Sequence, residues 1–191
     1  MSKLANKVVL VTGGSRGIGA AIAKRLAADG ASVAFTYARD TSAASAVVKA
    51  IELGGGKAVA IQADAADAQA VRGAVEKAVA TFGRLDVLVN NAGTAIPKPF
   101  EEATLEEMDR VLDINIRGIF AATQAALKHM KDGGRIVMIG SAVENVLLRP
   151  VLCPMRPRRE PSRCSLRRCP ERLGAGASRS TTFSQVRSTR I

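Results

Sequence analysis

The amino-acid sequence predicts an α/β fold in which helices cover both faces of a doubly wound parallel sheet. Short runs that are apolar at every position alternate with longer segments of helical periodicity, and such runs are typical of strands buried on both faces. A glycine-rich stretch, TGGSRGIG at residues 12–19, lies between the first apolar run and the first helical segment. From this repeated order of strand and helix we predict a doubly wound parallel sheet.

The composition limits the number of domains and indicates where in the cell the protein is located. A chain of 191 residues with 47% hydrophobic residues is long enough for one core and too short for two. The sequence has no run of 18 apolar residues, and the start MSKLANKVVL leads into a strand without a signal-peptide pattern. We therefore expect a cytoplasmic protein without a membrane partner.

Positive charge is concentrated at one end of the chain. Of the formal net charge of +11, residues 1–143 carry +3 and residues 144–191 carry +8. The second segment also contains all three cysteines and five of the seven prolines, but no lysine, aspartate or tyrosine. We therefore divide the chain into a folded domain, residues 1–143, and an aberrant arginine- and proline-rich tail, residues 144–191, which we expect to be disordered.

The elements of the folded domain follow from the apolar pattern and from residues that begin or end helices. Glycines at 30, 54–56 and 83 end the first three helices. Thr104 and Glu107 form the capping box of the fourth. Strands are expected at 7–12, 32–37, 57–62, 85–90 and 134–141, and helices at about 18–29, 42–53, 67–82 and 104–130.

The glycine-rich stretch is a candidate phosphate-binding loop. Glycines at 13, 17 and 19 permit a tight turn and a close approach of the backbone to a ligand. The following helix directs its unpaired N–H groups and positive dipole end toward the same place, which suits a pyrophosphate. Because the spacing G-x-x-x-G-x-G is looser than the dinucleotide fingerprint, an ordinary strand-to-helix loop is the alternative for these glycines alone.

Together with the motif NNAG at residues 90–93, this loop resembles the short-chain dehydrogenase/reductase family, and among its members the 3-oxoacyl-acyl-carrier-protein reductases most closely. The resemblance covers residues 5 to about 143. It implies a Rossmann-like fold with the strand order 3-2-1-4-5, and an oxidoreductase that uses NADP(H) to interconvert a small carbonyl substrate and its alcohol. Full-length members are homo-oligomers with a sixth and a seventh strand, before which the resemblance of this chain stops.

The resemblance assigns the candidate cofactor-binding residues. In the family the residue at Asp64 meets the adenine amino group, although Asp64 can also cap the helix near residue 67. The NNAG turn lies beside the nicotinamide ribose in the family, at the carboxyl edge of the sheet where such folds bind ligands. The candidates are Gly13, Ser15, Arg16, Gly17, Ile18, Gly19, Tyr37, Arg39, Asp64, Asn90, Ala92 and Gly93.

The end of the second strand favours NADP over NAD. An acidic residue there would bind the ribose 2′-hydroxyl and repel a 2′-phosphate, but this strand ends in Thr36 and Tyr37. Arg16 and Arg39 are able to bind the 2′-phosphate together. The alternative is that both arginines are ordinary solvated residues, and Asp40 just beyond the strand weakens the positive charge.

Two catalytic residues of the family are matched and two are missing. Asn115 matches the catalytic asparagine, and Ser141 matches the serine that holds the substrate carbonyl. About 12 to 14 residues after the serine the family has Y-x-x-x-K, in which the lysine lowers the tyrosine pKa and the tyrosine donates a proton. Tyr37 is the only tyrosine of this chain, and no lysine follows Lys131. The chain as written is therefore expected to be inactive.

The missing motif is recoverable from the tail in a displaced reading frame. Methionine has the single codon ATG. If the Pro154 codon ends in T, the frame displaced by one base therefore reads TAT, a tyrosine codon, at position 155. Positions 154–162 then permit Pro-Tyr-Ala-Ala-Thr-Lys-Gly-Ala-Val, and positions 177–191 permit a segment that resembles the sixth strand of the family. We interpret the tail as the product of one base lost near codon 144, in the gene or in its sequencing. The fifth strand would then lack a neighbour, leaving an apolar edge at residues 136–139.

Three functions remain open from the sequence. The first is an NADPH-dependent carbonyl reductase whose C-terminus is displaced, and the second is a non-catalytic NADP-binding module. The third takes the arginine-rich tail as an arm for RNA or another polyanion. The tail lacks lysine and any nucleic-acid-binding motif, so no nucleic-acid partner is expected. The spacings of Cys153, Cys164 and Cys169 match no zinc site, so free thiols and no metal are expected.

Overall fold

The computed structural model describes residues 4–140 and 186–190. The strands of these residues form one sheet with the order β3-β2-β1-β4-β5-β6. They are β1 (Val8–Val11), β2 (Ser32–Tyr37), β3 (Lys57–Gln62), β4 (Val87–Asn90), β5 (Arg135–Ile139) and β6 (Val186–Arg190). The first five strands are parallel, which confirms the predicted order 3-2-1-4-5.

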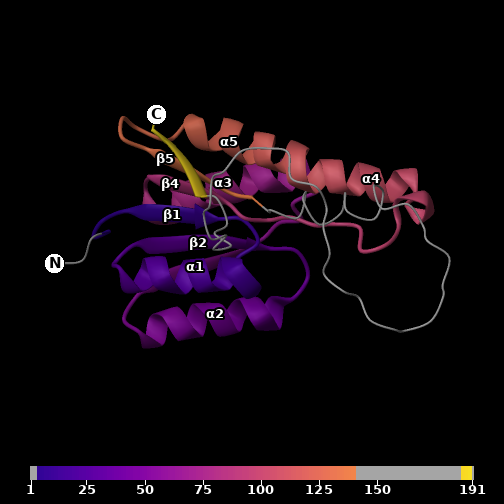
Figure 1. The fold of residues 1–191 in the computed structure, drawn as a ribbon. Helices are drawn as coiled ribbons and strands as arrows, with labels where there is room; N and C mark the ends of the chain where they lie inside the picture. Colours follow the sequence, from indigo (N-terminus) through magenta and orange to yellow (C-terminus); the bar gives the residue numbers. More distant parts are fainter. Residues whose placement is uncertain (1–3, 141–185, 191) are drawn as a thin grey trace, which may run out of the picture. The chain divides into compact units, whose positions relative to one another are not determined.

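Helices connect the parallel strands and cover the sheet on both faces, as Figure 1 shows. Helices α1 and α2 lie on one face, and α3 and α5 lie on the other. Between β4 and β5 the chain forms a short 3₁₀ turn, a helix, a π-helical segment and a second helix. The bounds are α1 (Gly17–Ala28), α2 (Thr41–Leu53), α3 (Ala68–Phe82), η1 (Phe100–Glu102), α4 (Leu105–Leu112), η2 (Asp113–Gly118) and α5 (Ile119–Leu127).

The central strand β1 contributes to the core on both faces of the sheet, because successive side chains of a strand point to opposite faces. Val8 and Leu10 pack in the cluster that contains residues of α3 and α5. Val9 and Val11 pack in the cluster that contains residues of α1 and α2. A strand buried in this way has to be apolar at every position, which explains the continuous apolar run of the sequence.

Local polar contacts set the ends of the helices and so place the loops at the carboxyl edge of the sheet. Asp67 caps α3, where its Oδ1 accepts two backbone hydrogen bonds. Gly83 ends the same helix with a φ of 78°, a left-handed conformation that favours glycine. The predicted capping box of Thr104 and Glu107 is present at the start of α4.

The prediction of one continuous helix over residues 104–130 is wrong in two respects. The π-helical segment η2 separates α4 from α5, and α5 ends at Leu127. A single wider turn leaves the apolar pattern of a helix almost unchanged, so the periodicity of the sequence does not reveal it. The helix also passes very close to the loop after β3, because a Cβ at Gly118 would lie 2.3 Å from the Ala65 carbonyl oxygen.

The expectation that the fifth strand lacks a neighbour is also wrong. Strand β6 pairs with β5 in antiparallel orientation, from Arg135 opposite Arg190 to Ile139 opposite Val186. Backbone hydrogen bonds make this pairing, and they do not require an apolar pattern in the added strand. Residues 144–185 lie outside the described residues, so the predicted disorder of that part of the tail stays a prediction.

None of the described helices combines the length and the apolar character that crossing a membrane requires.

Candidate functional site

A cavity of about 800 Å³ lies at the carboxyl ends of β1, β2, β3 and β4. This is the edge at which doubly wound sheets bind their ligands, and the volume is within the range of ligand cavities. Eleven of the twelve candidate cofactor residues line it, namely Gly13, Ser15, Arg16, Gly17, Ile18, Gly19, Tyr37, Arg39, Asp64, Ala92 and Gly93.

The glycine turn opens one side of this cavity. Gly13 and Gly17 have φ values of 68° and 54°, which favour glycine. A Cβ at Gly17 would meet no atom within 4 Å, whereas one at Gly19 would lie 2.2 Å from the Gly13 carbonyl oxygen. Arg16 is the N-cap of α1 and makes no side-chain cap hydrogen bond. No side chain therefore caps the first N–H groups of α1, and no neighbouring atom covers the backbone at Gly17 beside them.

Two polar residues that sequence reasoning missed join the glycine turn to the NNAG turn. Thr12 Oγ1 accepts hydrogen bonds from the backbone N–H groups of Asn91 and Ala92, both at 3.0 Å. Asn91 Nδ2 donates to the carbonyl oxygens of Thr12 and Gly13 at 2.9 and 3.0 Å. The two turns, 78 to 80 residues apart in sequence, are thus held as one unit.

Thr36 is a third missed residue and holds the glycine turn against β2. Its Oγ1 accepts from the Gly13 N–H at 3.0 Å, and its carbonyl oxygen accepts from the Gly14 N–H at 2.8 Å. A Cβ at Gly14 would lie 2.5 Å from the Phe35 Cβ. The sequence shows a threonine at the end of an apolar strand, but only the parallel pairing of β1 with β2 brings it to the turn.

Arg16 and Arg39 line the cavity with exposed side chains. Neither forms an ion pair with any residue in the described part of the chain. Asp40, which borders Arg39, caps α2 instead, since its Oδ1 accepts from the Ala43 N–H at 2.8 Å. Two positive charges therefore remain available to an anion in the cavity.

Asp64 does not cap the helix that follows it, because Asp67 fills that role. Asp64 Oδ1 accepts from the Ala66 N–H at 3.0 Å, and Oδ2 lies 3.3 Å from Nη2 of Arg110. The Ala66 hydrogen bond lowers the pKa of Asp64, and Arg110 and Arg39 lower it further, against the opposing effect of burial. Asp64 is thus an ionised side chain in the lining of the cavity. Sequence reasoning missed its partner Arg110, because 46 residues separate the two.

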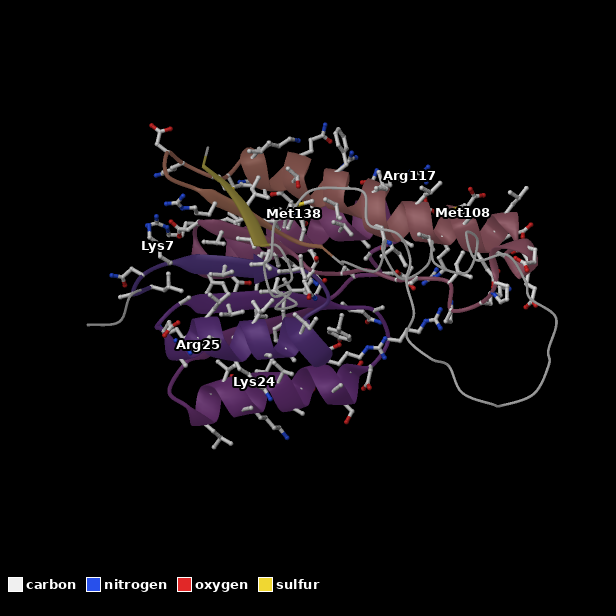
Figure 2. The ribbon with its side chains drawn as sticks, viewed as in Figure 1. Lys7, Lys24, Arg25, Met108, Arg117 and Met138 are labelled. Carbon is white, nitrogen blue, oxygen red and sulfur yellow. The ribbon has the colours of Figure 1, made fainter. Side chains whose placement is uncertain are left out.

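Asn90 is the candidate that the structure does not place in the cavity. Its side chain is buried. Its Nδ2 donates hydrogen bonds of 3.3 Å to Thr123 Oγ1 and to the sulfur of Met138, which is labelled in Figure 2. Asn91, the next residue, lines the cavity in its place. Side chains alternate between the faces at the end of a strand, so the two asparagines of the motif point to different surroundings.

Asn115 lies in the π-helical segment η2 and holds the loop after the NNAG turn. Its Oδ1 accepts from the Thr94 N–H at 2.9 Å, and its Nδ2 donates to the Thr94 carbonyl oxygen at 2.8 Å. The other catalytic candidate, Ser141, lies outside the described residues, as do the recoverable Y-x-x-x-K positions and the three cysteines. The joint placement of Asn115 and Ser141 therefore stays a prediction.

The family model described as short chain dehydrogenase matches residues 7–149. The chain belongs to this family. The match confirms the resemblance drawn from the glycine loop and the NNAG turn, while the finer likeness to 3-oxoacyl-acyl-carrier-protein reductases stays a prediction.

Curated relatives and solved structures support membership of the short chain dehydrogenase family. An uncharacterised oxidoreductase of Methylorubrum extorquens is 55% identical over 148 residues, which are 78% of this chain and 60% of that protein. Elsinochrome reductase 1 of Elsinoe fawcettii is 48% identical over 140 residues, 73% of this chain and 52% of that protein. A short chain dehydrogenase from Burkholderia cenocepacia, solved in complex with NADP, is 54% identical with a TM-score of 0.72, covering 74% of this chain and 58% of that one. The chain thus spans between half and about six tenths of these proteins.

Proposed function

We propose that residues 7–140 bind NADP(H) as the nucleotide-binding part of a reductase that converts a carbonyl group, of a 3-oxoacyl or similar ketone, to an alcohol. The observation that carries this proposal is the meeting of two features in one cavity: the uncapped N-terminus of α1, and the unpaired guanidinium groups of Arg16 and Arg39. Backbone N–H groups at a helix start suit a pyrophosphate, and two free arginines suit a further phosphate.

The residues present fit a dinucleotide phosphate. The backbone at Gly17 is open to the cavity, because a Cβ there would meet nothing within 4 Å. No carboxylate occupies the two strand-end positions Thr36 and Tyr37, and the nearby Asp40 is committed to capping α2. The cavity extends from the glycine turn past Arg39 to Asp64, so it has room for both ends of an extended ligand.

The chemistry divides between the nucleotide and the protein. NADPH supplies a hydride when it is bound. The protein has to hold the carbonyl substrate and donate a proton to its oxygen. Ser141 is our candidate for holding the substrate carbonyl, and Asn115 is the second catalytic candidate, which fixes the backbone of Thr94 at the cavity. The chain as written lacks the tyrosine and the lysine that donate this proton in the family, so we propose that it binds nucleotide without reducing a carbonyl.

Relatives support the reductase assignment. Elsinochrome reductase 1 and a probable tetrahydroxynaphthalene reductase of Zymoseptoria tritici are 48% and 46% identical to this chain over 140 residues each. A blue fluorescent protein from a metagenomic library was solved in complex with NADPH and is 54% identical, with a TM-score of 0.71. The second candidate function is a non-catalytic NADP-binding module, which the missing tyrosine and lysine favour for the chain as it stands.

Insertion of one base in codon 144 tests the reductase proposal. The repaired gene would supply the tyrosine at position 155 and the lysine four residues later, with apolar segments in place of the arginine-rich tail. We expect NADPH oxidation by a panel of 3-oxoacyl thioesters and diketones, abolished when the recovered tyrosine is changed to phenylalanine. The chain as written should show no turnover. A repaired protein that folds but reduces no carbonyl in a tyrosine-dependent way would leave the non-catalytic module as the better account.

A further inference from the structure

One wall of the nucleotide cavity is a helix with little packing of its own. No residue of α4 is buried, and Leu105 at its start is 80% exposed. Nevertheless Arg110 of α4 and Ile114 of the following segment line the cavity. Burial of apolar side chains is what normally holds a helix in place, so polar contacts have to contribute much of the attachment of α4.

Among the ion pairs of the described residues, the pair of Arg110 with Asp64 connects α4 to a distant part of the chain. Asp64 follows β3, and its Oδ2 lies 3.3 Å from Arg110 Nη2. The other ion pair of α4 joins Glu107 to Lys98 at 2.7 Å, and Lys98 belongs to the loop that leads into the same helix. The Asp64 contact therefore connects α4 itself to the loop that follows β3.

The same ion pair fixes the direction of a carboxylate in the cavity. The Ala66 N–H holds one oxygen of Asp64, and Arg110 holds the other. Both Asp64 and Arg110 line the cavity, together with the free Arg39. Without Arg110, the second oxygen of Asp64 would be free to turn toward Arg39 and compete with a phosphate for that charge.

We propose that Arg110 is a positioning residue for nucleotide binding: its ion pair with Asp64 holds α4 as a wall of the cavity and keeps the Asp64 carboxylate in place. This inference rests on the proposed function, since the nucleotide in question is NADP(H). Arg110 itself lines the cavity, but the proposed effect acts through its ion pair with Asp64, so this effect has to disappear when Asp64 can no longer form the pair.

A double-mutant cycle tests the proposal by titration of NADPH into the chain. Arg110→Gln should weaken binding by about 2- to 5-fold, the range expected for a half-exposed ion pair. Arg110→Lys keeps the charge and should restore part of the affinity. In an Asp64→Asn background, Arg110→Gln should have no further effect.

Arg117 provides a matched control. It forms an ion pair with Asp113 on the same stretch of helix, lies on the outer side where 69% of its side chain is exposed (Figure 2), and does not line the cavity. Arg117→Gln removes the same chemical group and should leave NADPH affinity unchanged. An equal loss of affinity in both variants would show a general charge effect and overturn the positioning role.

Hydrogen exchange of the nucleotide-free chain gives a readout that does not depend on binding. Arg110→Gln should speed exchange of the α4 amides by about 2- to 5-fold and leave those of α3 unchanged. Unchanged α4 exchange together with unchanged NADPH affinity overturns the inference. The failure of the proposed function is distinct, because a wild-type chain that binds no nucleotide contradicts that function whatever Arg110 does to α4.

Discussion

The phosphate side of the cavity and its α4 side are built in different ways. Around the glycine turn, the hydroxyls of Thr12 and Thr36 accept backbone hydrogen bonds, and both residues are at most 6% exposed. On the other side, α4 has no buried residue and is joined to the loop after β3 by an ion pair in which the Arg110 side chain is 51% exposed. Buried hydrogen bonds resist water and salt, whereas exposed ion pairs do not. We therefore expect the glycine-turn side of the cavity to be rigid and its α4 side to be adjustable.

The largest expected effect is on the phosphate side. Gly19→Ala would place a methyl group 2.2 Å from the Gly13 carbonyl oxygen and 2.5 Å from Asn91 Nδ2. Because one of these atoms is backbone, the turn has to move, and we expect a loss of about 3 kcal/mol in unfolding free energy. Chemical denaturation followed by circular dichroism measures this.

Gly73→Ala is the matched control, since a Cβ there would meet nothing within 4 Å in the middle of α3. It should stabilise the chain by about 0.5 to 1 kcal/mol. Equal stability of Gly19→Ala and the wild type would mean that the glycine turn is not rigid.

Removal of a charge on the rigid side comes next. Arg39→Ala should weaken NADP binding by about 1.5 to 3 kcal/mol, the value of one charge-assisted hydrogen bond to phosphate. NAD has no 2′-phosphate, so its affinity should change little. Calorimetric titration of both nucleotides measures the difference, and a similar loss for NAD would show that Arg39 acts on the fold instead of the phosphate.

A smaller effect is expected on the adjustable side. Thr104→Ala removes the hydroxyl that accepts from the Glu107 N–H at the start of α4. Loss of such a cap costs about 1 kcal/mol when the helix is part of the cooperative core. Since α4 has no buried residue, we expect faster hydrogen exchange of its amides and a loss of less than about 0.5 kcal/mol in the unfolding free energy of the whole domain. A full loss of 1 kcal/mol would show that α4 is as firmly held as the phosphate side.

A pH-dependent effect is expected at Asp86, which lies at the opposite edge of the sheet from the cavity. Burial raises the pKa of Asp86, but the Val8 N–H, Arg84 and Lys7 outweigh it and bring the pKa below the ordinary value. A depressed pKa stabilises the fold above the unfolded pKa of about 4 and stops doing so as the pH falls through the folded pKa. The difference in unfolding free energy between wild type and Asp86→Asn should therefore be largest at pH 7 and decrease below pH 4. Denaturation at a series of pH values checks this, and a gap that does not change with pH would contradict it.

The positions of the strands and of the glycine turn could be predicted because they depend on patterns within short segments, whereas the strand order came from the family resemblance; eleven of the candidate residues line the cavity. The positive φ of Gly17 and the apolar run of β1 are examples of such local requirements. Thr36 and Arg110 were missed, since their partners lie 23 and 46 residues away and depend on which elements become neighbours. Asn90 is buried and Asn91 lines the cavity, because the motif does not show which of its two asparagines faces the cavity.

The most direct test of the central claim is a titration of NADPH and NADH into the chain as it stands, followed by nicotinamide fluorescence. We expect NADPH to bind at least about 10-fold more tightly than NADH, because one charge-assisted contact to the 2′-phosphate is worth about 1.5 to 3 kcal/mol. We also expect the preference for NADPH to disappear in the Arg16→Ala, Arg39→Ala double variant. Equal affinity of the wild-type chain for the two nucleotides would contradict the assignment of these arginines and with it the NADP(H) site.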